Sequence, residues 1–473
     1  MADELSWTWT SGRPGMALPT ATPSTTSGWV LPRPRILVCA YACHPTRGSE
    51  EAVGWNWVQA MASFCEVTVI TAGFHRDAIE AYLRTTSAPW ASHVTFIYPP
   101  SRPWHYRPTP SWCWIEGSLL KPLMNHAYRS WLRSAARIAA RLVAGQHYDL
   151  THQLTYVGFR FPGGLWRLAP PFVWGPIGGM EDTPWRLFGA LGPVGMLYFG
   201  GRNVMNQLHR WLLRAPRQAA VRAGPGLIAA TSGIAGALQR CYGCPSTIVS
   251  EVTSPLRASG ISLRGPDEPL RLAWSGAHIP RKALPLLLRA LAGLAADLDW
   301  RLDIYGSGPR TAAWQRQVAR LGLVASRCTW HGKVRRSEAI SGLRRAHLFV
   351  ITSLQDLTST VLLEAMSQGL PVLCPDHCGF PDVVTAAAGI CLPIDRPATF
   401  VGALRAALRQ LAADEPERRR LAAGALARAG QYDLPAKIEA LQYVYTRVLA
   451  IPDSQCTPNG IPGETGVPVT PIR

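Results

Sequence analysis

One stretch of this chain, residues 347–384, limits the choice of fold more than any other. It starts with an apolar run at 348–351, whose length and β-branched residues are typical of a buried parallel strand. A polar loop follows, then a helix that begins near Thr358 and ends at Gly369, and then a second apolar strand from Leu370. This order predicts an α/β fold with a parallel sheet. The loop would lie at the carboxyl edge of the sheet, where open α/β sheets bind ligands.

Two carboxylates of this stretch stand eight residues apart, Asp356 on the loop and Glu364 about one turn into the helix. The start of a helix presents unpaired N–H groups and the positive end of the helix dipole, so it can bind a diphosphate. Asp356 and Glu364 could then accept hydrogen bonds from sugar hydroxyls on either side of the phosphates. The alternative is that Asp356 caps the helix and Glu364 faces solvent, and the pair alone does not decide between the two.

The same stretch resembles the donor-site signature of GT-B glycosyltransferases of family 4, also called group 1. In that signature, two acidic residues with seven residues between them are followed by an EAM-x-x-G-x-P-V run and a G-x-P-[ED] turn. The matching positions here are Asp356, Glu364, Gly369, residues 371–372 and residues 379–382. The first acidic residue of the family is usually Glu, so Asp356 reaches one methylene less far.

The resemblance covers roughly residues 35–450 and implies two doubly wound Rossmann-like domains facing a cleft. The alternating β and α patterns predict the same α/β fold class independently, and 473 residues suit two domains with tails. We expect a disordered leader at 1–34, an acceptor-binding domain at 35–252 and a linker at 253–268. A nucleotide-sugar-binding domain at 269–430, a helix that crosses back to the first domain at 431–451 and a disordered tail at 452–473 would follow.

In the first domain, the strand at 35–40 leads into a loop with Gly48 and Ser49 before a helix. Such a turn permits close approach of the backbone to a phosphate or sugar, and a plain helix start capped by Ser49 is the alternative. The resemblance implies a turn that faces the donor phosphates and the acceptor, in the H-P-x-x-G-S-E form of a bacterial polysaccharide branch. His152 ends the strand at 148–153. A lone histidine there is more often structural, but the resemblance implies a catalytic His152 that points into the cleft.

In the second domain, Arg281 and Lys282 follow the strand at 270–276. Cations between a strand and a helix can neutralise a leaving diphosphate, and the alternative is that both are solvated. The resemblance implies that Lys282 is the phosphate-binding lysine of the family. The family's arginine falls on Ala277, so we expect Arg281 to replace it.

Further features belong to the donor site that the resemblance implies. Gly306 and Gly308 form a G-x-G-P turn after a strand. Lys333 and Val334 follow a strand whose backbone would pair with the nucleotide base. We expect two kinds of group to stabilise the departing diphosphate. The cations are the side chains of Arg281 and Lys282, and the donors are the backbone N–H groups of Thr358, Ser359 and Thr360.

The reaction that the resemblance implies is the transfer of a hexose, with retention, from a nucleotide diphosphate sugar to an acceptor hydroxyl. Asp356 would hold the hydroxyls of the donor sugar and act with Lys282 and His152 in catalysis, and Glu364 would hold the ribose. No residue stands out as a covalent nucleophile, so we expect attack from the face that the phosphate leaves. We expect no metal and no cofactor, because the D-x-D string at 297–299 precedes a strand and does not end one.

The net charge of +18 comes almost wholly from arginine and suits phosphate-rich ligands, nucleic acid or an anionic membrane. Two segments rich in tryptophan, leucine and arginine, 99–141 and 185–222, suit the headgroup region of a membrane, and the alternative is that they pack on their own sheet. We expect a lipid-linked saccharide acceptor in surface polysaccharide assembly and no nucleic acid partner. With no secretory signal pattern near Met1, we expect a cytoplasmic protein at the inner face of the plasma membrane. An epimerase-type or a catalytically silent protein with the same fold stays open.

Overall fold

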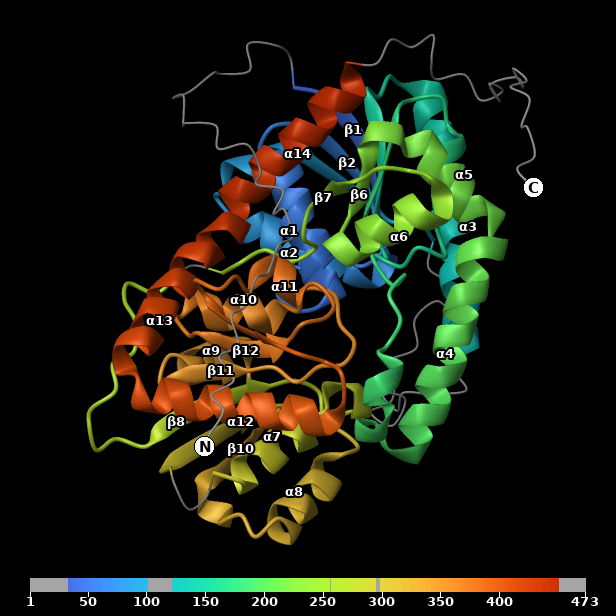
Figure 1. The fold of residues 1–473 in the computed structure, drawn as a ribbon. Helices are drawn as coiled ribbons and strands as arrows, with labels where there is room; N and C mark the ends of the chain where they lie inside the picture. The colour runs from blue at the N-terminus through green and yellow to red at the C-terminus, as the bar shows by residue number, and fades with distance from the viewer. Residues whose placement is uncertain (1–32, 101–120, 256, 295–297, 451–473) are drawn as a thin grey trace, which may run out of the picture. The chain divides into compact units, whose positions relative to one another are not determined.

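Two fully parallel β-sheets organise the structure (Figure 1). The computed structural model describes residues 33–100, 121–255, 257–294 and 298–450. Parallel strands are joined through helices that cover both faces of a sheet, so each strand is apolar along its length. Strand β1 (Arg35–Ala40) shows this pattern, because every residue after Arg35 is buried. The two sheets confirm the predicted fold class.

The first sheet has seven parallel strands in the order β3-β2-β1-β4-β5-β6-β7. Successive strands are added on one side of β1 up to β3 and on its other side from β4 onward, so the strand order reverses between β1 and β4. Ligands of such sheets bind beyond the carboxyl ends of the strands at this reversal. The strands after β1 are β2 (Glu66–Ile70), β3 (Val94–Ile97), β4 (Leu150–Thr155), β5 (Phe172–Ile177), β6 (Leu227–Ala229) and β7 (Thr247–Ile248). The helices between them are α1 (Glu50–Ala62), α2 (Arg76–Thr85), α3 (Lys121–Gly145), α4 (Gly192–Leu212), α5 (Arg214–Ala223) and α6 (Ser232–Tyr242).

The second sheet has six strands in the order β10-β9-β8-β11-β12-β13 and reverses between β8 and β11. Its strands are β8 (Leu270–Ser275), β9 (Trp300–Tyr305), β10 (Cys328–Gly332), β11 (Leu348–Val350), β12 (Val372–Pro375) and β13 (Gly389–Leu392). Its helices are α7 (Leu284–Ala292), α8 (Thr311–Arg320), α9 (Arg336–Leu343), α10 (Thr360–Ser367), α11 (Phe380–Val383), α12 (Pro397–Ala413) and α13 (Glu415–Ala429). Strand β13 was not predicted, because it is an edge strand of four residues, two of them only partly buried.

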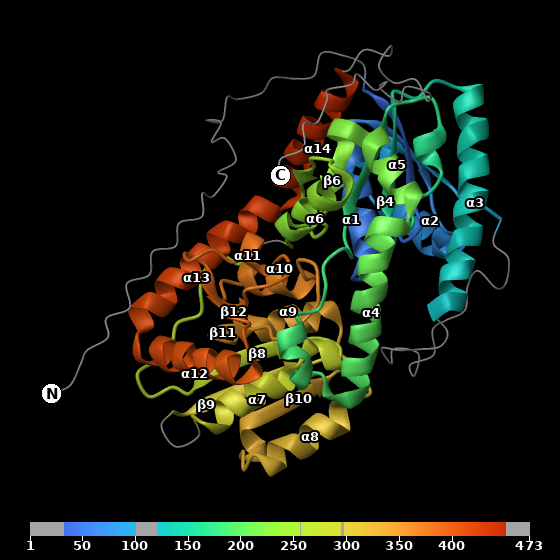
Figure 2. The same cartoon turned by 45° about the vertical axis from the view of Figure 1, so that its right-hand side comes forward.

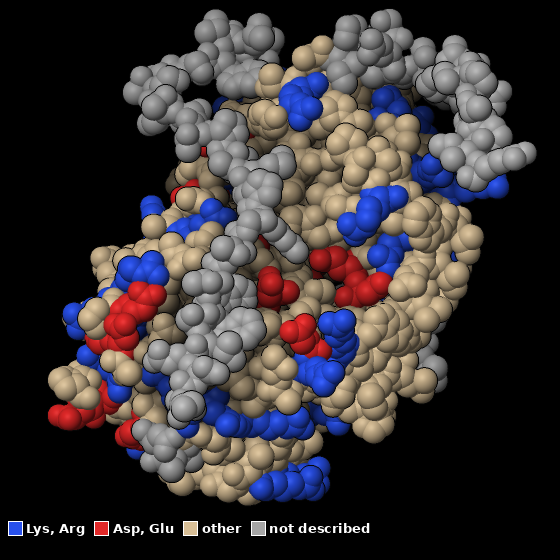
Figure 3. Space-filling view, viewed as in Figure 1, with Lys and Arg blue, Asp and Glu red and all other residues tan. Residues whose placement is uncertain are grey.

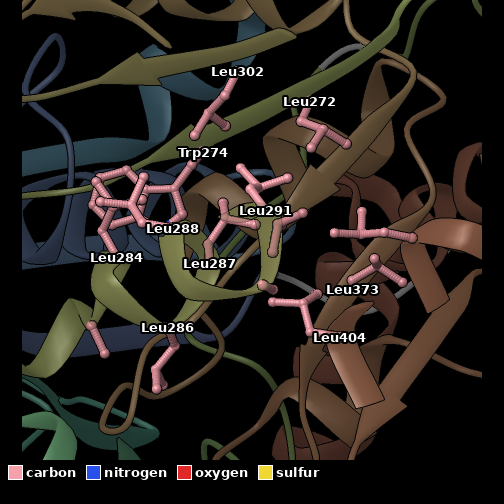
Figure 4. Packing of buried hydrophobic residues seen from close by; sticks show 14 of the residues in the cluster. Leu272, Trp274, Leu284, Leu286, Leu287, Leu288, Leu291, Leu302, Leu373 and Leu404 are labelled. Carbon is pink, nitrogen blue, oxygen red and sulfur yellow. The ribbon is translucent and has the colours of Figure 1, made fainter. Parts of the chain in front are cut away.

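The core of the second domain is built largely from leucine. Figure 4 shows Leu284, Leu287 and Leu291 of α7 pointing toward Trp274 of β8 and Leu302 of β9. All five side chains are at most 1% exposed. Burying a leucine side chain contributes about 1.5–3 kcal/mol, so this cluster holds α7 firmly against β8 and fixes the loop between them.

Two helices connect the domains in space. The last helix, α14 (Leu434–Leu449), packs against α1, and Leu441 and Tyr445 belong to the same core as Trp57 of the first domain. Helix α4 belongs to the first domain in sequence but packs on the second. Leu191 at its start and Phe199 lie in the leucine core of the second domain. Figures 1 and 2 show both helices running from the region of one sheet to that of the other.

The segment 99–141 only partly matches the expectation of a membrane-facing surface. Trp131 on α3 is 2% exposed and lies in the core of the first domain, so the expectation is wrong for this side chain. The exposed side of α3 carries four arginines one turn apart, Arg129, Arg133, Arg137 and Arg141. The other tryptophans of this segment lie outside the described residues, namely Trp104, Trp112 and Trp114. Across the described part of the chain, the helices lack the length and hydropathy that a membrane span requires.

Candidate functional site

The loops after β8 and β11 meet at the strand reversal of the second sheet. The first loop contains a short 3-10 helix, Pro280–Lys282, that carries both predicted cations. Two hydrogen bonds tie it to the second loop: Thr352 Oγ1 donates to the Lys282 carbonyl at 2.7 Å, and the Leu354 N–H donates to the Arg281 carbonyl at 2.8 Å. The backbone that carries the cations is therefore fixed against the loop that carries Asp356.

Lys282, Arg281 and Asp356 form one ionic cluster, in which Lys282 is buried and the other two are partly buried. Lys282 Nζ forms an ion pair with Asp356 Oδ2, and Arg281 Nη1 lies 3.5 Å from Asp356 Oδ1 and donates to the Gln355 carbonyl at 2.6 Å. Burial lowers the pKa of Lys282, and Asp356 opposes that change. Burial alone would raise the pKa of Asp356, but Lys282 and Arg281 outweigh it and hold the pKa below its ordinary value. Solvation of the two cations, the alternative for this loop, is wrong for Lys282, which is 9% exposed.

The start of α10 differs in part from the prediction. The helix begins at Thr360, and Ser359 before it has a φ of 71°, a left-handed conformation that turns the chain into the helix. Asp356 does not cap this helix. The Thr358 N–H and Oγ1 donate to the two carboxylate oxygens of Glu251 at 2.9 and 3.0 Å, so this N–H group is already paired. Within the described residues, the N–H groups of Ser359 and Thr360 have no hydrogen-bond partner and stay free for an anion.

Glu364 lies inside the protein and not in solvent. It is 7% exposed, and its Oε1 accepts a hydrogen bond of 2.5 Å from Arg336 Nε at the start of α9. Burial raises the pKa of Glu364, and Arg336 opposes the rise. Half of the Arg336 side chain is exposed, so it can move away from Glu364.

The glycines Gly306 and Gly308 have a structural explanation. A Cβ atom on Gly306 would lie 2.0 Å from the carbonyl oxygen of Gly276, and one on Gly308 would lie 2.7 Å from that of His278. Both glycines therefore let the loop after β9 pack against the loop after β8. Lys333 is exposed after β10 and Val334 is half-buried. No hydrogen bond or ion pair of the described residues joins Lys333 to the ionic cluster.

In the first domain, the turn before α1 is open. Gly48 and Ser49 are exposed, and a Cβ atom on Gly48 would meet nothing within 4 Å. Ser49 has a φ of 60°, and its hydroxyl does not cap α1, so the capping alternative is wrong. The turn is thus accessible to a ligand.

His152 does not fit the catalytic role that the resemblance implied. It is fully buried, with Nε2 donating to the Gly175 carbonyl at 2.8 Å and Nδ1 accepting from the Tyr445 hydroxyl at 2.7 Å. Burial lowers its pKa to about 4, so the ring is neutral at pH 7. Both nitrogens are occupied, and the side chain joins α14 to the first sheet.

The structure adds two residues at the strand reversal of the first sheet, Glu50 and Tyr156. Glu50 is the first residue of α1, and its Oε1 accepts a hydrogen bond of 2.7 Å from the Val157 N–H. Tyr156 directly follows β4 and is 38% exposed, with ring centroids 5.0 Å from Tyr41 and 4.8 Å from Tyr128. A carboxylate beside an aromatic surface suits a small polar ligand with an apolar face, as a sugar ring has. The signal for Glu50 is its place directly after Gly48 and Ser49.

Replacing Glu50 with glutamine is expected to flatten the pH dependence of stability. Burial raises the pKa of Glu50 from 4.5 to about 7, so between these values the folded state keeps a proton that the unfolded state has lost. The stability from this group is full below about pH 4.5 and is lost as the pH rises to about 7. Between about pH 5 and pH 8, urea unfolding should show wild type losing about 1–3 kcal/mol more than Glu50→Gln. Equal losses would contradict the raised pKa.

Other charged groups lie close to the ionic cluster. Glu181 follows β5, and burial raises its pKa to about 7, while Thr231 Oγ1 donates to it at 3.3 Å. Arg202 of α4 lies against Gln355, next to Asp356. Figure 3 shows acidic and basic side chains gathered together near the middle of one face. Among the described residues, no three His, Cys, Asp or Glu side chains come together as metal ligands.

Several solved structures similar to this chain in fold are described as glycosyltransferases or as a related synthase. Sucrose-phosphate synthase (tll1590) from Thermosynechococcus elongatus matches with a TM-score of 0.59 at 15% identity, over 88% of this chain and 100% of that chain. WaaG, a glycosyltransferase involved in lipopolysaccharide biosynthesis, matches with a TM-score of 0.52 at 19% identity, over 87% and 99%. Anabaena Alr3699/HepE in complex with UDP and glucose matches with a TM-score of 0.51 at 14% identity, over 87% and 99%. At these identities the likeness establishes the fold.

The fold is that of GT-B glycosyltransferases. Residues 269–410 match the family model described as Glycosyl transferases group 1. The match confirms the resemblance over the donor-site signature. No curated protein matches the sequence.

Proposed function

We propose that this protein transfers a sugar, with retention, from a nucleotide diphosphate sugar to a hydroxyl of a lipid-linked saccharide in surface polysaccharide synthesis. The observation that carries the proposal is the ionic cluster of Lys282, Arg281 and Asp356 beside the free N–H groups at the start of α10. Together these groups offer positive charge and hydrogen-bond donors to the oxygens of one bound ligand. A diphosphate leaving group needs both.

The cluster would stabilise the charge that develops as the diphosphate leaves. Lys282 is buried, so its charge acts through a lower effective dielectric constant than a surface lysine and stabilises a phosphate oxygen more strongly. Asp356 holds Lys282 in place before the donor binds. When the phosphate takes over Lys282, Asp356 becomes free to accept hydrogen bonds from the donor sugar.

The nucleotide would bind along α10 toward Glu364. Its buried carboxylate suits the two hydroxyls of a ribose once Arg336 has moved aside. The solved structure of similar fold with UDP and glucose supports a uridine nucleotide as the first one to test.

The transfer step would proceed on one face of the sugar. The bond between the anomeric carbon and the phosphate oxygen breaks, and the acceptor oxygen forms its bond on the same face. The acceptor proton passes to an oxygen of the leaving phosphate, so the products are the glycoside and the nucleoside diphosphate. A double displacement would need a free carboxylate nucleophile, whereas Asp356 is paired with Lys282 and Arg281.

The acceptor would bind in the first domain. Gly48 and Ser49 are accessible, and Glu50 and Tyr156 lie at the strand reversal of the same sheet. Glu50 would accept a hydrogen bond from a saccharide hydroxyl while the ring of Tyr156 covers an apolar sugar face. A lipid-linked acceptor would also place the protein at the cytoplasmic face of the membrane.

The proposal is tested with nucleotide sugars labelled in the sugar. Thermal stabilisation by a panel that includes UDP-glucose selects the donor. Lipid-linked saccharides extracted from bacterial membranes then serve as acceptors, and NMR determines the anomeric configuration of the labelled product. We expect label in the lipid fraction with the configuration of the donor. An inverted product, release of an epimerised nucleotide sugar, or stabilisation without any turnover would each overturn the proposal.

A further inference from the structure

Helix α4 presents its large apolar side chains to the outside. The most exposed apolar side chains are those of Val194, Leu197, Val204, Met205, Leu208, Trp211 and Leu212, with exposures of 66, 83, 51, 47, 46, 68 and 69%, and Met196 follows at 39%. At 100° per residue the first seven fall within about 120° of the helix circumference. These seven residues, here called the α4 stripe, form one continuous face of the helix.

The opposite face of α4 is turned inward and carries two asparagines beside the buried Phe199. Asn203 and Asn206 are fully buried. Asn203 accepts from the Thr183 N–H at 3.0 Å and donates to the Thr183 carbonyl at 2.8 Å, while Asn206 donates to the Met180 carbonyl at 3.1 Å and accepts from Arg160 at 2.7 Å. A surface helix usually has the reverse pattern, with apolar residues inside. These hydrogen bonds fix the rotation of α4, so the α4 stripe stays outside.

The charged side chains of α4 and α5 are all arginines, and Asp182 pairs with one of them, Arg210, at 2.5 Å. Between Asp182 and Glu251 the sequence contains seven arginines and no acidic residue. Arg214 and Arg217 are exposed on α5, directly after the stripe, beside Val221 at 63% exposure. In Figure 3 the surface over α4 is largely uncharged. An apolar stripe continued by arginines complements an apolar surface with negative charge at its edge.

We propose that the α4 stripe and the exposed arginines of α5 dock this protein on an anionic lipid bilayer, with α4 lying in the plane of the headgroups. Trp211 and Leu212 would enter the boundary of the acyl chains, and Arg214 and Arg217 would contact lipid phosphates. A second copy of the chain fits this face less well, because it would bring two arginine-rich surfaces together, and Asp182, the carboxylate beside α4, is already paired with Arg210.

The docked helix would bring the donor site to the membrane. The start of α4 packs beside the 3-10 helix that carries Arg281 and Lys282, and a Cβ atom on Gly195 would lie 3.3 Å from Pro280. Arg202 of the same helix lies against Gln355 in the donor-site loop. The inference deepens the proposed function, because it rests on a lipid-linked acceptor for its purpose. Its test measures lipid binding without turnover, so the two can fail separately.

The test uses the full chain and sedimentation with vesicles of phosphatidylcholine, either pure or mixed equally with phosphatidylglycerol. We expect binding to the mixed vesicles and little to the pure ones, with affinity falling as salt rises. The variant Leu197→Glu/Trp211→Glu/Leu212→Glu should lose at least about tenfold in affinity for the mixed vesicles. Arg214→Glu/Arg217→Glu should lose binding to a similar extent.

Matched controls separate the face from general hydrophobicity and charge. Val324→Glu changes a side chain with 58% exposure in the second domain, and Arg316→Glu/Arg320→Glu changes exposed charges on α8. Both should bind vesicles like wild type, and UDP should stabilise all variants equally. Wild-type binding by the triple variant, equal binding to both kinds of vesicle, or a dimer that the triple variant abolishes would each overturn the proposal. Vesicle binding without any sugar transfer would count against the proposed function alone.

Discussion

Replacing Lys282 with methionine is expected to lower kcat/KM for the nucleotide sugar about 100- to 1000-fold. The side chain is 9% exposed and forms its ion pair with Asp356 at the strand reversal of the second sheet. Methionine fills nearly the same volume without the charge, so the packing around α7 stays intact. We expect kcat/KM to fall because the variant lacks the buried cation that stabilises the negative charge developing on the departing diphosphate.

Steady-state kinetics and UDP titration by calorimetry measure this effect. Lys282→Arg keeps the positive charge and should retain more activity than Lys282→Met. Arg320→Met removes an exposed cation on α8 and serves as the control for net charge. Thermal unfolding of each variant shows whether the fold is intact. Unchanged kcat/KM in a folded Lys282→Met would exclude Lys282 from the donor site.

Replacing Glu251 with alanine is expected to cost about 2–4 kcal/mol of unfolding free energy and to raise KM for the donor at least about tenfold. Glu251 accepts hydrogen bonds from the Thr358 N–H and hydroxyl across 107 residues of sequence. Thr358 is buried, so alanine leaves its N–H unpaired, while its hydroxyl keeps only the hydrogen bond of 3.1 Å from Ser250 Oγ. The free N–H groups of Ser359 and Thr360 are then no longer oriented by the contact between Glu251 and Thr358.

The backbone around Glu251 is held from the first domain. Trp57 Nε1 donates to the Glu251 carbonyl at 2.9 Å, and Lys437 of α14 donates to the Val252 carbonyl at 3.1 Å and to that of Ser250. Burial lowers the pKa of Lys437 to about 7. Glu251 thus connects a fixed segment of the first domain to the start of α10, and it positions the donor site without touching the donor.

Two further variants distinguish a role of Glu251 in positioning the donor site from a role in stabilising the fold alone. Glu251→Gln keeps one acceptor oxygen and should restore part of both losses, and Glu439→Ala removes an exposed carboxylate of α14 as the control. Urea unfolding gives the stability, and initial rates give KM and kcat separately. If Glu251→Ala loses stability while KM for the donor stays at the wild-type value, Glu251 supports the fold alone.

The parallel strands could be predicted because each is a short apolar run between turn residues. The strand predicted at 35–40 is β1 as the structure has it, and the loop with Asp356 lies at the predicted sheet edge. The edge strand β13 gave a weaker signal because half of it is partly exposed. The start of α10 was misplaced by two residues, since the left-handed Ser359 has no signature in its residue type.

The partners of the buried charges could not be predicted in the same way. Glu251 pairs with Thr358 and His152 with Tyr445, at sequence separations of 107 and 293 residues. Local patterns carry no information on such pairs, because they depend on how the two domains and α14 come together. Family resemblance suggested a catalytic His152, whereas burial by α14 gives it a structural role.

The central claim is that a diphosphate binds between the Lys282 loop and the start of α10. The most direct measurement is a crystal structure of the full chain with UDP. We predict a phosphate oxygen within hydrogen-bond distance of Lys282 Nζ and of the N–H groups of Ser359 and Thr360, with the ribose at Glu364. A diphosphate bound elsewhere, with Lys282 still paired to Asp356 alone, would contradict the account.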